Sequence, residues 1–258
     1  MEEVMQHFRK DEQPYVEMAI GWIREVEDTY APKLTGFLDP RQRFIVESIA
    51  AGTNLKFESY GAFSEAERMR VLIYPDYYVP EPSEYQITTF KVKYASKFLT
   101  LGHKDVLGSM MSLGIERSKF GDIRIGEDEV QFAVANELKD YMTANFTSIG
   151  KAKVTVEEVS NLEEMIVTFD KWIETMYIIS SMRLDVVVAA VGNIARQKAA
   201  TLIHGEKVKV NWVVRSQPAF ELFEADMLSI RGFGRYKVLA VEGKTRKDKI
   251  RLLIGKLE

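Results

Sequence analysis

The sequence contains no cysteine, only three histidines and no long run of apolar residues. The absence of cysteine excludes disulfides, thiolate zinc sites and thiol nucleophiles, and it favours a reducing compartment. His7, His103 and His204 lie far apart in the chain, so they give no support to a histidine-rich metal site. No window approaches the roughly 20 apolar residues of a membrane-spanning helix, and the charged N-terminus is unlike a signal peptide. We therefore expect a soluble, cytoplasmic protein that needs no metal or cofactor.

The motifs of common enzyme classes are missing as well. Gly232-Phe233-Gly234 lacks the third glycine and the strand–turn–helix context of a phosphate-binding loop. The segment 108–114 lacks the spacing of a nucleophile elbow, and the carboxylate runs 127–129 and 157–158 are typical of solvated turns and strand edges. We therefore expect no catalytic residues and no small-molecule substrate.

The positive charge is concentrated in the last third of the chain. The whole sequence has 35 Lys and Arg against 38 Asp and Glu, a net charge of -3. Residues 1–70 hold 9 basic and 13 acidic side chains, residues 71–180 hold 11 and 17, and residues 181–258 hold 15 and 8. Clustered Lys and Arg gain free energy by releasing counterions from phosphates, so this asymmetry indicates nucleic acid or anionic membrane. Charge alone does not separate these partners from a solvated lysine-rich tail.

Hydrophobic periodicity divides the chain into successive regions. Residues 1–68 are predicted to be helical, with apolar residues at spacings of three and four from Val16 to Val26 and a second helix that begins at Asp39-Pro40. Residues 69–160 are predicted to form an α+β domain of the ferredoxin-like or RNA-recognition-motif kind. Its expected strands and helices, in chain order, are 69–74, 86–95, helix 103–113, 123–125, 130–134, helix 136–146 and 153–159.

The last two regions are a helical connector at 161–180 and a basic domain at 181–258. The basic domain is expected to start with two short helices, the first closed by Gly192 and the second capped by Asn193. A strand from Glu206 to Val214 follows, with Lys207 and Lys209 pointing outward. A later strand pair, 227–230 and 236–241, is joined by the loop 231–235.

The order of residues in the basic domain resembles the S4 (alpha-L) RNA-binding domain. The segments that carry the resemblance are Arg183-Leu184-Asp185, Ala195-Arg196-Gln197-Lys198-Ala199, Leu202-Ile203, Gly205 and Val208-Lys209-Val210-Asn211. One difference is Ala195, which stands where this domain commonly has Ser or Thr before the helix arginine. The resemblance implies a domain that binds structured RNA.

As an RNA clamp, this domain would use its basic residues on phosphates and its glycine loop for close approach to the backbone. Phe233 either stacks on a base or packs inward, and the same alternative is open for Trp212. Asp185 is expected to be a capping residue. The predicted RNA-binding residues are Arg183, Arg196, Gln197, Lys198, Lys207, Lys209, Arg231, Gly232, Phe233, Gly234 and Arg235. The residues His103, Lys104, Arg117 and Lys119 are most simply a helix start with its adjoining loop, and a second RNA or protein contact is the alternative.

Over its whole length the chain resembles the YlmH family of bacterial S4-domain proteins. The matching segments are His7–Glu12, Phe37–Arg41, Gly102–Asp105, Gly121–Ile123, Asn211-Trp212 and Ser229–Arg235. The resemblance implies a non-enzymatic factor that binds rRNA and tRNA on a large ribosomal subunit carrying peptidyl-tRNA. It also implies a link to rescue of stalled nascent chains and C-terminal alanine tailing, and genes that lie near division genes.

Two other classes of function stay open at this point. An RNA-modifying enzyme is one, because the same domain is often attached to pseudouridine synthases and methyltransferases. A division-linked adaptor that uses its basic C-terminus on anionic lipid is the other.

Overall fold

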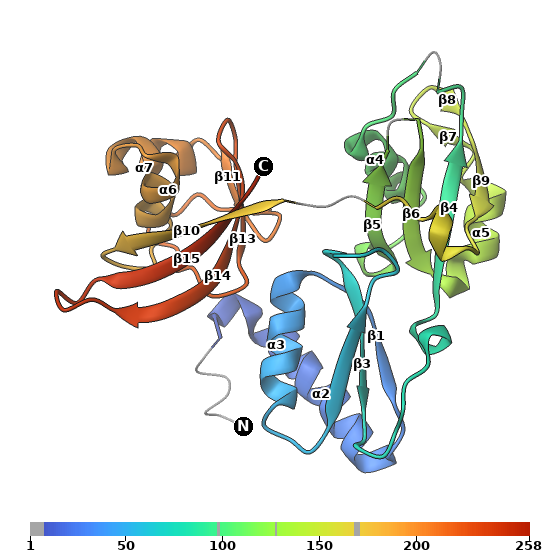
Figure 1. The fold of residues 1–258 in the computed structure, drawn as a ribbon, viewed down its shortest axis with the longest axis horizontal. Coiled ribbons are helices and arrows are strands. Elements are labelled where there is room, and N and C mark those ends of the chain that lie inside the picture. The colour runs from blue at the N-terminus through green and yellow to red at the C-terminus, as the bar shows by residue number, and fades with distance from the viewer. Residues whose placement is uncertain (1–7, 97–98, 127, 168–170) are drawn as a thin grey trace. The chain divides into compact units, whose positions relative to one another are not determined.

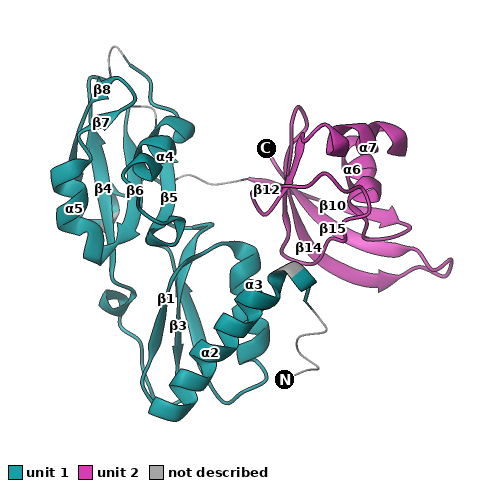
Figure 2. Cartoon of the chain, turned by 180° about the vertical axis from the view of Figure 1, so that it is seen from behind, with its two compact units in different colours: residues 1–169 teal, residues 170–258 magenta. Residues whose placement is uncertain are grey.

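The computed structural model describes residues 8–96, 99–126, 128–167 and 171–258 (Figure 1). The chain divides into two compact units, residues 1–169 and 170–258 (Figure 2). In the described residues, the first unit has several sheets and core clusters, and the second has one sheet with one core cluster. Helices and antiparallel strands occur in both units, which confirms the predicted α+β class.

The first unit begins with the two predicted helices. Asp39 caps the second of them, since its carboxylate accepts a hydrogen bond from the Gln42 main-chain N–H at 2.8 Å. The helices and strands of this region are α2 (Gln13–Thr29), β1 (Lys33–Leu38), α3 (Pro40–Ala50), β2 (Lys56–Tyr60) and β3 (Met69–Tyr74). Helix α2 buries the side chains that predicted it, namely Val16, Ala19, Ile23 and Val26.

The sheet of this region corrects one assignment made from the sequence. Strand β3 was expected to open the middle domain, but it pairs with β1 and β2 in the order β1-β3-β2. The apolar run of β3 is buried between partners that are themselves partly polar, so local alternation did not reveal β1 and β2. The N-terminal region is therefore helical and sheet-containing, not helical alone.

The next region of the first unit has the predicted ferredoxin-like topology. Its four-stranded antiparallel sheet has the order β5-β6-β4-β9, with two helices in the crossovers. The helices pack on one face of the sheet around Phe90, Phe132, Met110 and Met142. The bounds are β4 (Ile87–Lys93), α4 (His103–Ser112), β5 (Phe120–Ile125), β6 (Val130–Ala135), α5 (Lys139–Asn145) and β9 (Thr155–Glu158), with a small hairpin, β7 (Ser148–Ile149) and β8 (Ala152–Lys153), after α5.

The predicted helical connector at 161–180 is wrong for most of its described length. A single 3-10 turn covers Leu162–Glu164, and β10 occupies Trp172–Ile179. Strand β10 pairs with β15 (Ile250–Leu257) over eight residues. Its apolar residues fit a helical spacing too, and the partner that decides between the two lies far along the chain. Residues 168–170 of the connector lie outside the described residues.

The second unit is a six-stranded sheet with the order β10-β15-β14-β13-β11-β12, covered on one face by two helices. Its remaining helices and strands are α6 (Leu184–Gly192), α7 (Arg196–His204), β11 (Val208–Val210), β12 (Val213–Val214), β13 (Met227–Ile230) and β14 (Gly234–Lys244). Among the described helices, none alone is long and apolar enough to cross a membrane. Only α6 and α7 together reach that length and composition, across a bend of 115°.

Two local predictions in this unit are corrected. Asn193 does not cap α7 but ends α6 in a left-handed conformation, with φ 47°, and Ala195 is the N-cap of α7. The expected strand 206–214 folds back on itself as the hairpin β11–β12, because Asn211 and Trp212 have φ of 50° and 65°. Two consecutive left-handed residues form a tight hairpin turn that reverses the chain.

Candidate RNA interface

Two arginines of the second unit converge on one buried carboxylate. Arg183 donates from Nε and Nη2 to the two Asp185 oxygens at 3.1 and 3.0 Å. Arg196 donates from Nε to Oδ2 of the same carboxylate at 2.9 Å. The Asp185 side chain is 6% exposed, whereas those of Arg183 and Arg196 are 40% and 56% exposed. The carboxylate therefore anchors both guanidinium groups and leaves part of each facing solvent.

The charge balance of this arginine pair favours an anionic ligand. Burial alone would raise the pKa of Asp185, but hydrogen bonds from Arg183 and Arg196 outweigh it and hold that pKa below its ordinary value. One carboxylate between two guanidinium groups leaves a net positive charge. Each guanidinium has N–H groups beyond those given to Asp185, and such groups fit phosphate oxygens in a planar, bidentate way. Asp185 thus positions the arginines, which corrects its expected role as a cap.

The lowered pKa of Asp185 predicts a specific pH dependence of stability. A carboxylate with a lowered folded pKa stabilises the fold above its unfolded pKa of about 3.9, and this contribution is lost as the pH falls through the folded pKa. At pH 7 we expect Asp185→Asn to lower the free energy of unfolding by about 1–2 kcal/mol. Urea unfolding at pH 7 and at pH 3 measures this difference, which should shrink at the lower pH. A difference of equal size at both pH values would show that the charge of Asp185 does not matter.

The glycine loop, residues 231–235, lies at the other end of α6 from Asp185. A Cβ atom on Gly192 would lie 3.3 Å from the Phe233 ring, so Phe233 packs inward on the end of α6 instead of standing free for a base. The Arg231 main-chain N–H donates to the Lys207 carbonyl at 2.9 Å, which joins these two basic residues. At 1.5 Å per residue, the stretch of α6 from Asp185 to Gly192 is about 10 Å long, and this length separates the arginine pair from the glycine loop.

Other predicted residues lie on the opposite face of the sheet. Lys209 pairs with Ser229, and Ser229 pairs with Arg235, so the three side chains form a row across β11, β13 and β14. The alternating residues Val208 and Ile230 are buried under the helices, which places the row on the uncovered face. The hydrogen bond from Arg231 to Lys207 continues the pairing by one residue and adds both side chains to this basic row.

The predicted site is thus divided between two surfaces. The exposed residues Gln197 and Lys198 follow Arg196 in the first turn of α7, where the helical period of 100° per residue turns Lys198 away from Arg196. The basic row holds Lys207, Lys209, Arg231 and Arg235. Gly232 and Gly234 have φ of 88° and 112° and shape the turn between β13 and β14.

Sequence reasoning missed two basic residues. Lys237 lies on the face of Arg235, two residues further along β14. The guanidinium carbon of Arg215 lies 4.3 Å above the Phe220 ring, and the Phe220 carbonyl accepts a hydrogen bond from the Leu184 N–H. Alternation along β14 would have indicated Lys237. The position of Arg215 depends on a loop-to-helix contact that no local pattern reveals.

The residues considered for a second contact do not form one surface. His103 and Lys104 are exposed in the first turn of α4, while Arg117 and Lys119 follow its other end. A helix of ten residues separates them by about 15 Å. Arg117 donates to the Phe120 carbonyl at 2.7 Å, and burial, with the nearby Arg68 charge, lowers the pKa of Arg117 to about 10. Lys119 pairs with Glu137. The four residues therefore lie at two ends of α4 and not side by side.

The ferredoxin-like sheet has its helices on one face only. Part of the other face is covered by the N-terminal region of the same unit. Phe37 packs with Ala133 and Ala135 of β6, and a Cβ atom on Gly121 would lie only 2.8 Å from the Phe37 ring. RNA-recognition motifs stack bases on aromatic side chains of this face. Here the strand aromatics Phe90 and Phe132 point into the core beneath the helices. This sheet therefore offers no such stacking platform.

A largely buried carboxylate, 12% exposed, fastens the same contact between the two regions of the first unit. The Asp122 oxygens accept hydrogen bonds from the main-chain N–H groups of Glu67 and Arg68 at 2.7 and 3.0 Å. Arg68 is itself buried and donates to the Phe37 carbonyl at 2.7 Å. The segment Gly121-Asp122, which contributed to the family resemblance, therefore has a structural role.

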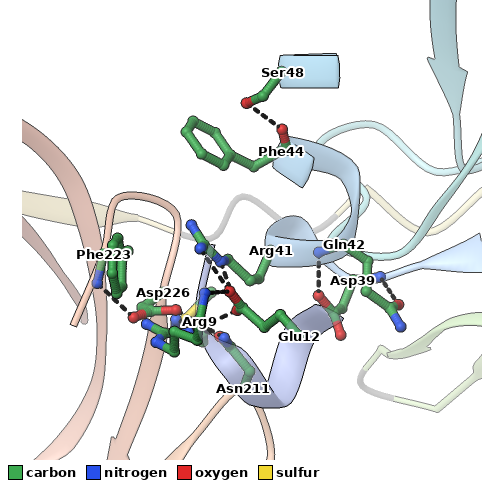
Figure 3. A network of polar contacts seen from close by, with 11 residues as sticks. Arg9, Glu12, Asp39, Arg41, Gln42, Phe44, Ser48, Asn211, Phe223 and Asp226 are labelled. Carbon is green, nitrogen blue, oxygen red and sulfur yellow. Dashed lines mark hydrogen bonds and ion pairs between the residues drawn. The ribbon is translucent and has the colours of Figure 1, made fainter. Parts of the chain in front are cut away.

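The N-terminal motif also has a structural role (Figure 3). Glu12 accepts hydrogen bonds from Arg9 at 2.7 Å and from Arg41 at 2.9 Å. Burial would raise the pKa of Glu12, but the bonds to Arg41 and Arg9 hold it below its ordinary value. This ion-pair cluster ties the start of α2 to α3. His7, from the same motif, lies outside the described residues.

Metal-binding geometry is absent from the part of the chain that the structure describes, where no group of three or more His, Asp or Glu side chains could hold an ion. The chemistry that the described residues do support is ionic binding of a polyanion at the arginine pair and at the basic row.

Comparison with known proteins assigns the chain to a family. Family models match as "YlmH, N-terminal" at residues 11–78, as "Putative RNA-binding domain in YlmH" at 80–163 and as the S4 domain at 182–228. The "Ribosome-associated protein quality control protein P2" of Bacillus subtilis is 40% identical over 252 residues, which is 98% of each chain. A solved structure, "Cell division protein ylmH from Streptococcus pneumoniae", is 35% identical, with a TM-score of 0.55 over 62% of this chain and 98% of that one. The chain therefore belongs to the YlmH family and carries an S4 domain at its C-terminus.

Proposed function

We propose that this protein is a non-enzymatic, cytoplasmic RNA-binding factor that contacts rRNA and peptidyl-tRNA on the large ribosomal subunit. The observation that carries the proposal is the arginine pair Arg183 and Arg196, held on the buried Asp185 at the start of the S4 domain. The name of the Bacillus subtilis relative, a ribosome-associated quality-control protein, supports the same role.

The geometry favours recognition of phosphates and shape over reading of base edges. Two oriented guanidinium groups and a row of basic side chains match the phosphates of a folded RNA, whose deep, narrow major groove hides its base edges from side chains. Because release of counterions drives such binding, affinity should fall steeply as salt rises. A structured rRNA or tRNA surface is the target that fits these features.

Removal of the second unit tests this function directly. We expect a chain that ends at residue 169 to lose sedimentation with purified large ribosomal subunits, because both basic surfaces lie in residues 170–258. Circular dichroism checks that the shortened chain is folded. Undiminished sedimentation of the folded shortened chain would move the binding site to the first unit.

Two further arms separate the partners and the alternatives. Subunits that carry peptidyl-tRNA should bind the full chain more tightly than empty subunits, and equal binding would remove peptidyl-tRNA from the proposal.

Anionic vesicles treated with RNase should not retain the protein. Retention there, without binding to the ribosome, would favour the membrane adaptor. Incubation with rRNA followed by mass analysis of its nucleosides should show no modified base, whereas a mass or isomer change would indicate an RNA-modifying enzyme.

A further inference from the structure

The tip of the β11–β12 hairpin holds a large aromatic residue in a conformation that suits glycine. Val210 pairs with Val213, so Asn211 and Trp212 are the two residues of the turn, with φ of 50° and 65°. A two-residue turn of this kind favours Asn-Gly, because a side chain is strained at positive φ. Asn211 fits the first position. Trp212 at the second position is an outlier that needs another explanation.

The turn is held in place from one side. The Asn211 amide donates to a buried Asp226 oxygen at 2.8 Å and accepts from the Met227 N–H at 2.9 Å. The other Asp226 oxygen accepts from the Phe223 N–H at 2.7 Å (Figure 3). Strained residues persist where their surroundings fix them, and they concentrate at functional sites. This clamp fixes the backbone that carries Trp212.

Trp212 lies outside the hydrophobic core cluster of the domain. The residue is 42% exposed, next to Val213 and Val214, which are 52% and 41% exposed. Lys209 of the basic row pairs with Val214 and lies on β11, the strand that leads into the turn. An exposed aromatic surface beside cations that hold a phosphate backbone is the combination with which proteins bind unpaired nucleotides.

We propose that Trp212 stacks on an unpaired base of the bound RNA while the basic row holds the adjacent phosphates. This proposal rests on the proposed RNA-binding function and deepens it, because it names the class of RNA: a folded RNA with an accessible base in a loop, bulge or end. The basic charge around the turn favours this occupant over an apolar protein segment.

The test compares two RNA probes with the full-length protein. One is a perfectly paired hairpin stem, and the other is the same stem with an added internal loop of unpaired purines. The native protein should bind the looped probe about tenfold more tightly, as expected for one stacked base. Trp212→Gly should abolish this preference and leave the slope of log affinity against log salt unchanged. Trp212→Phe should keep most of the preference.

The glycine variant also separates stacking from a structural role. Because glycine suits the turn, Trp212→Gly should raise the denaturant midpoint, so loss of binding would not reflect unfolding. Tyr30→Gly is the matched control, since Tyr30 is an exposed aromatic residue with φ 54° in the first unit. It should leave the preference for the loop intact.

Several results would overturn the proposal. A loop preference that survives Trp212→Gly would remove stacking while leaving the RNA-binding function in place. If Trp212→Gly bound both probes as tightly as the native protein but bound ribosomal subunits more weakly, Trp212 would be assigned to a protein contact. Failure of the native protein to bind either probe would contradict the RNA-binding function itself, and the stacking proposal with it.

Discussion

The double variant Arg183→Ala/Arg196→Ala is expected to bind RNA about 100-fold more weakly than the native protein. Each guanidinium offers charge-assisted hydrogen bonds to phosphate, and the loss of about 1.5 kcal/mol or more for each corresponds to about tenfold in affinity. The dependence of log affinity on log salt should also become shallower by about two units, because two phosphate contacts disappear. Filter binding of rRNA fragments over a range of salt concentrations measures both quantities.

The structure supplies the reason why the effect is specific to these two residues. Both arginines are already oriented by Asp185, so little side-chain entropy is lost when a phosphate binds. The control Lys10→Ala/Lys56→Ala removes the same charge from exposed positions of the N-terminal region and should change affinity little. Equal weakening by the control and by the arginine variant would reduce the site to a general effect of net charge.

Asp122→Ala is expected to lower the free energy of unfolding of the first unit by about 3 kcal/mol. Its carboxylate accepts two main-chain hydrogen bonds from Glu67 and Arg68 and lies 3.4 Å from the Arg124 guanidinium. Removal of the carboxylate leaves two part-buried N–H groups and a buried guanidinium without this acceptor, which costs more than the loss of an exposed ion pair. Guanidinium chloride unfolding, followed by circular dichroism, measures the change.

Asp76→Ala is the matched control for that experiment, because Asp76 is exposed and its removal should change stability by no more than about 0.5 kcal/mol. RNA binding by the second unit should survive Asp122→Ala wherever the protein is still folded. A loss of less than about 1 kcal/mol would show that Asp122 does not fasten the two regions of the first unit together.

Local patterns predicted the parts of the fold that local chemistry determines. The stripe from Val16 to Val26 indicated α2, and the sequence Asp39-Pro40 indicated the start of α3. The alternating and apolar segments of the ferredoxin-like region indicated β4, β5 and β6, which the structure confirms as strands of one sheet. In each case the residues that specify the helix or strand lie within that element or at its start.

Features that depend on distant partners were not predictable in the same way. Strand β10 becomes a strand only because β15, some 80 residues later by position in the chain, supplies its hydrogen bonds. Pairing of β3 with β1 depends equally on contacts beyond the local window. The division of the basic residues into an arginine pair and a basic row follows from the strand register, which composition and charge do not determine.

The candidate site shows the same limit. The sequence indicated Arg183 and Arg196 as RNA-binding residues. It predicted a capping role for Asp185, because an aspartate at the start of a helix commonly accepts hydrogen bonds from the first main-chain N–H groups. Only the fold brings Arg196 of α7 to the carboxylate of α6. The left-handed φ of Trp212 was equally hidden, since a strand was expected there.

The most direct test of the central claim is crosslinking of the protein to RNA in living cells, followed by sequencing of the attached fragments and mapping of the crosslinked peptides. Binding through the arginine pair and the basic row predicts fragments of large-subunit rRNA and tRNA joined to peptides from residues 170–258, and their loss in Arg183→Ala/Arg196→Ala. Crosslinks confined to peptides of the first unit, or fragments that persist unchanged in the double variant, would contradict it.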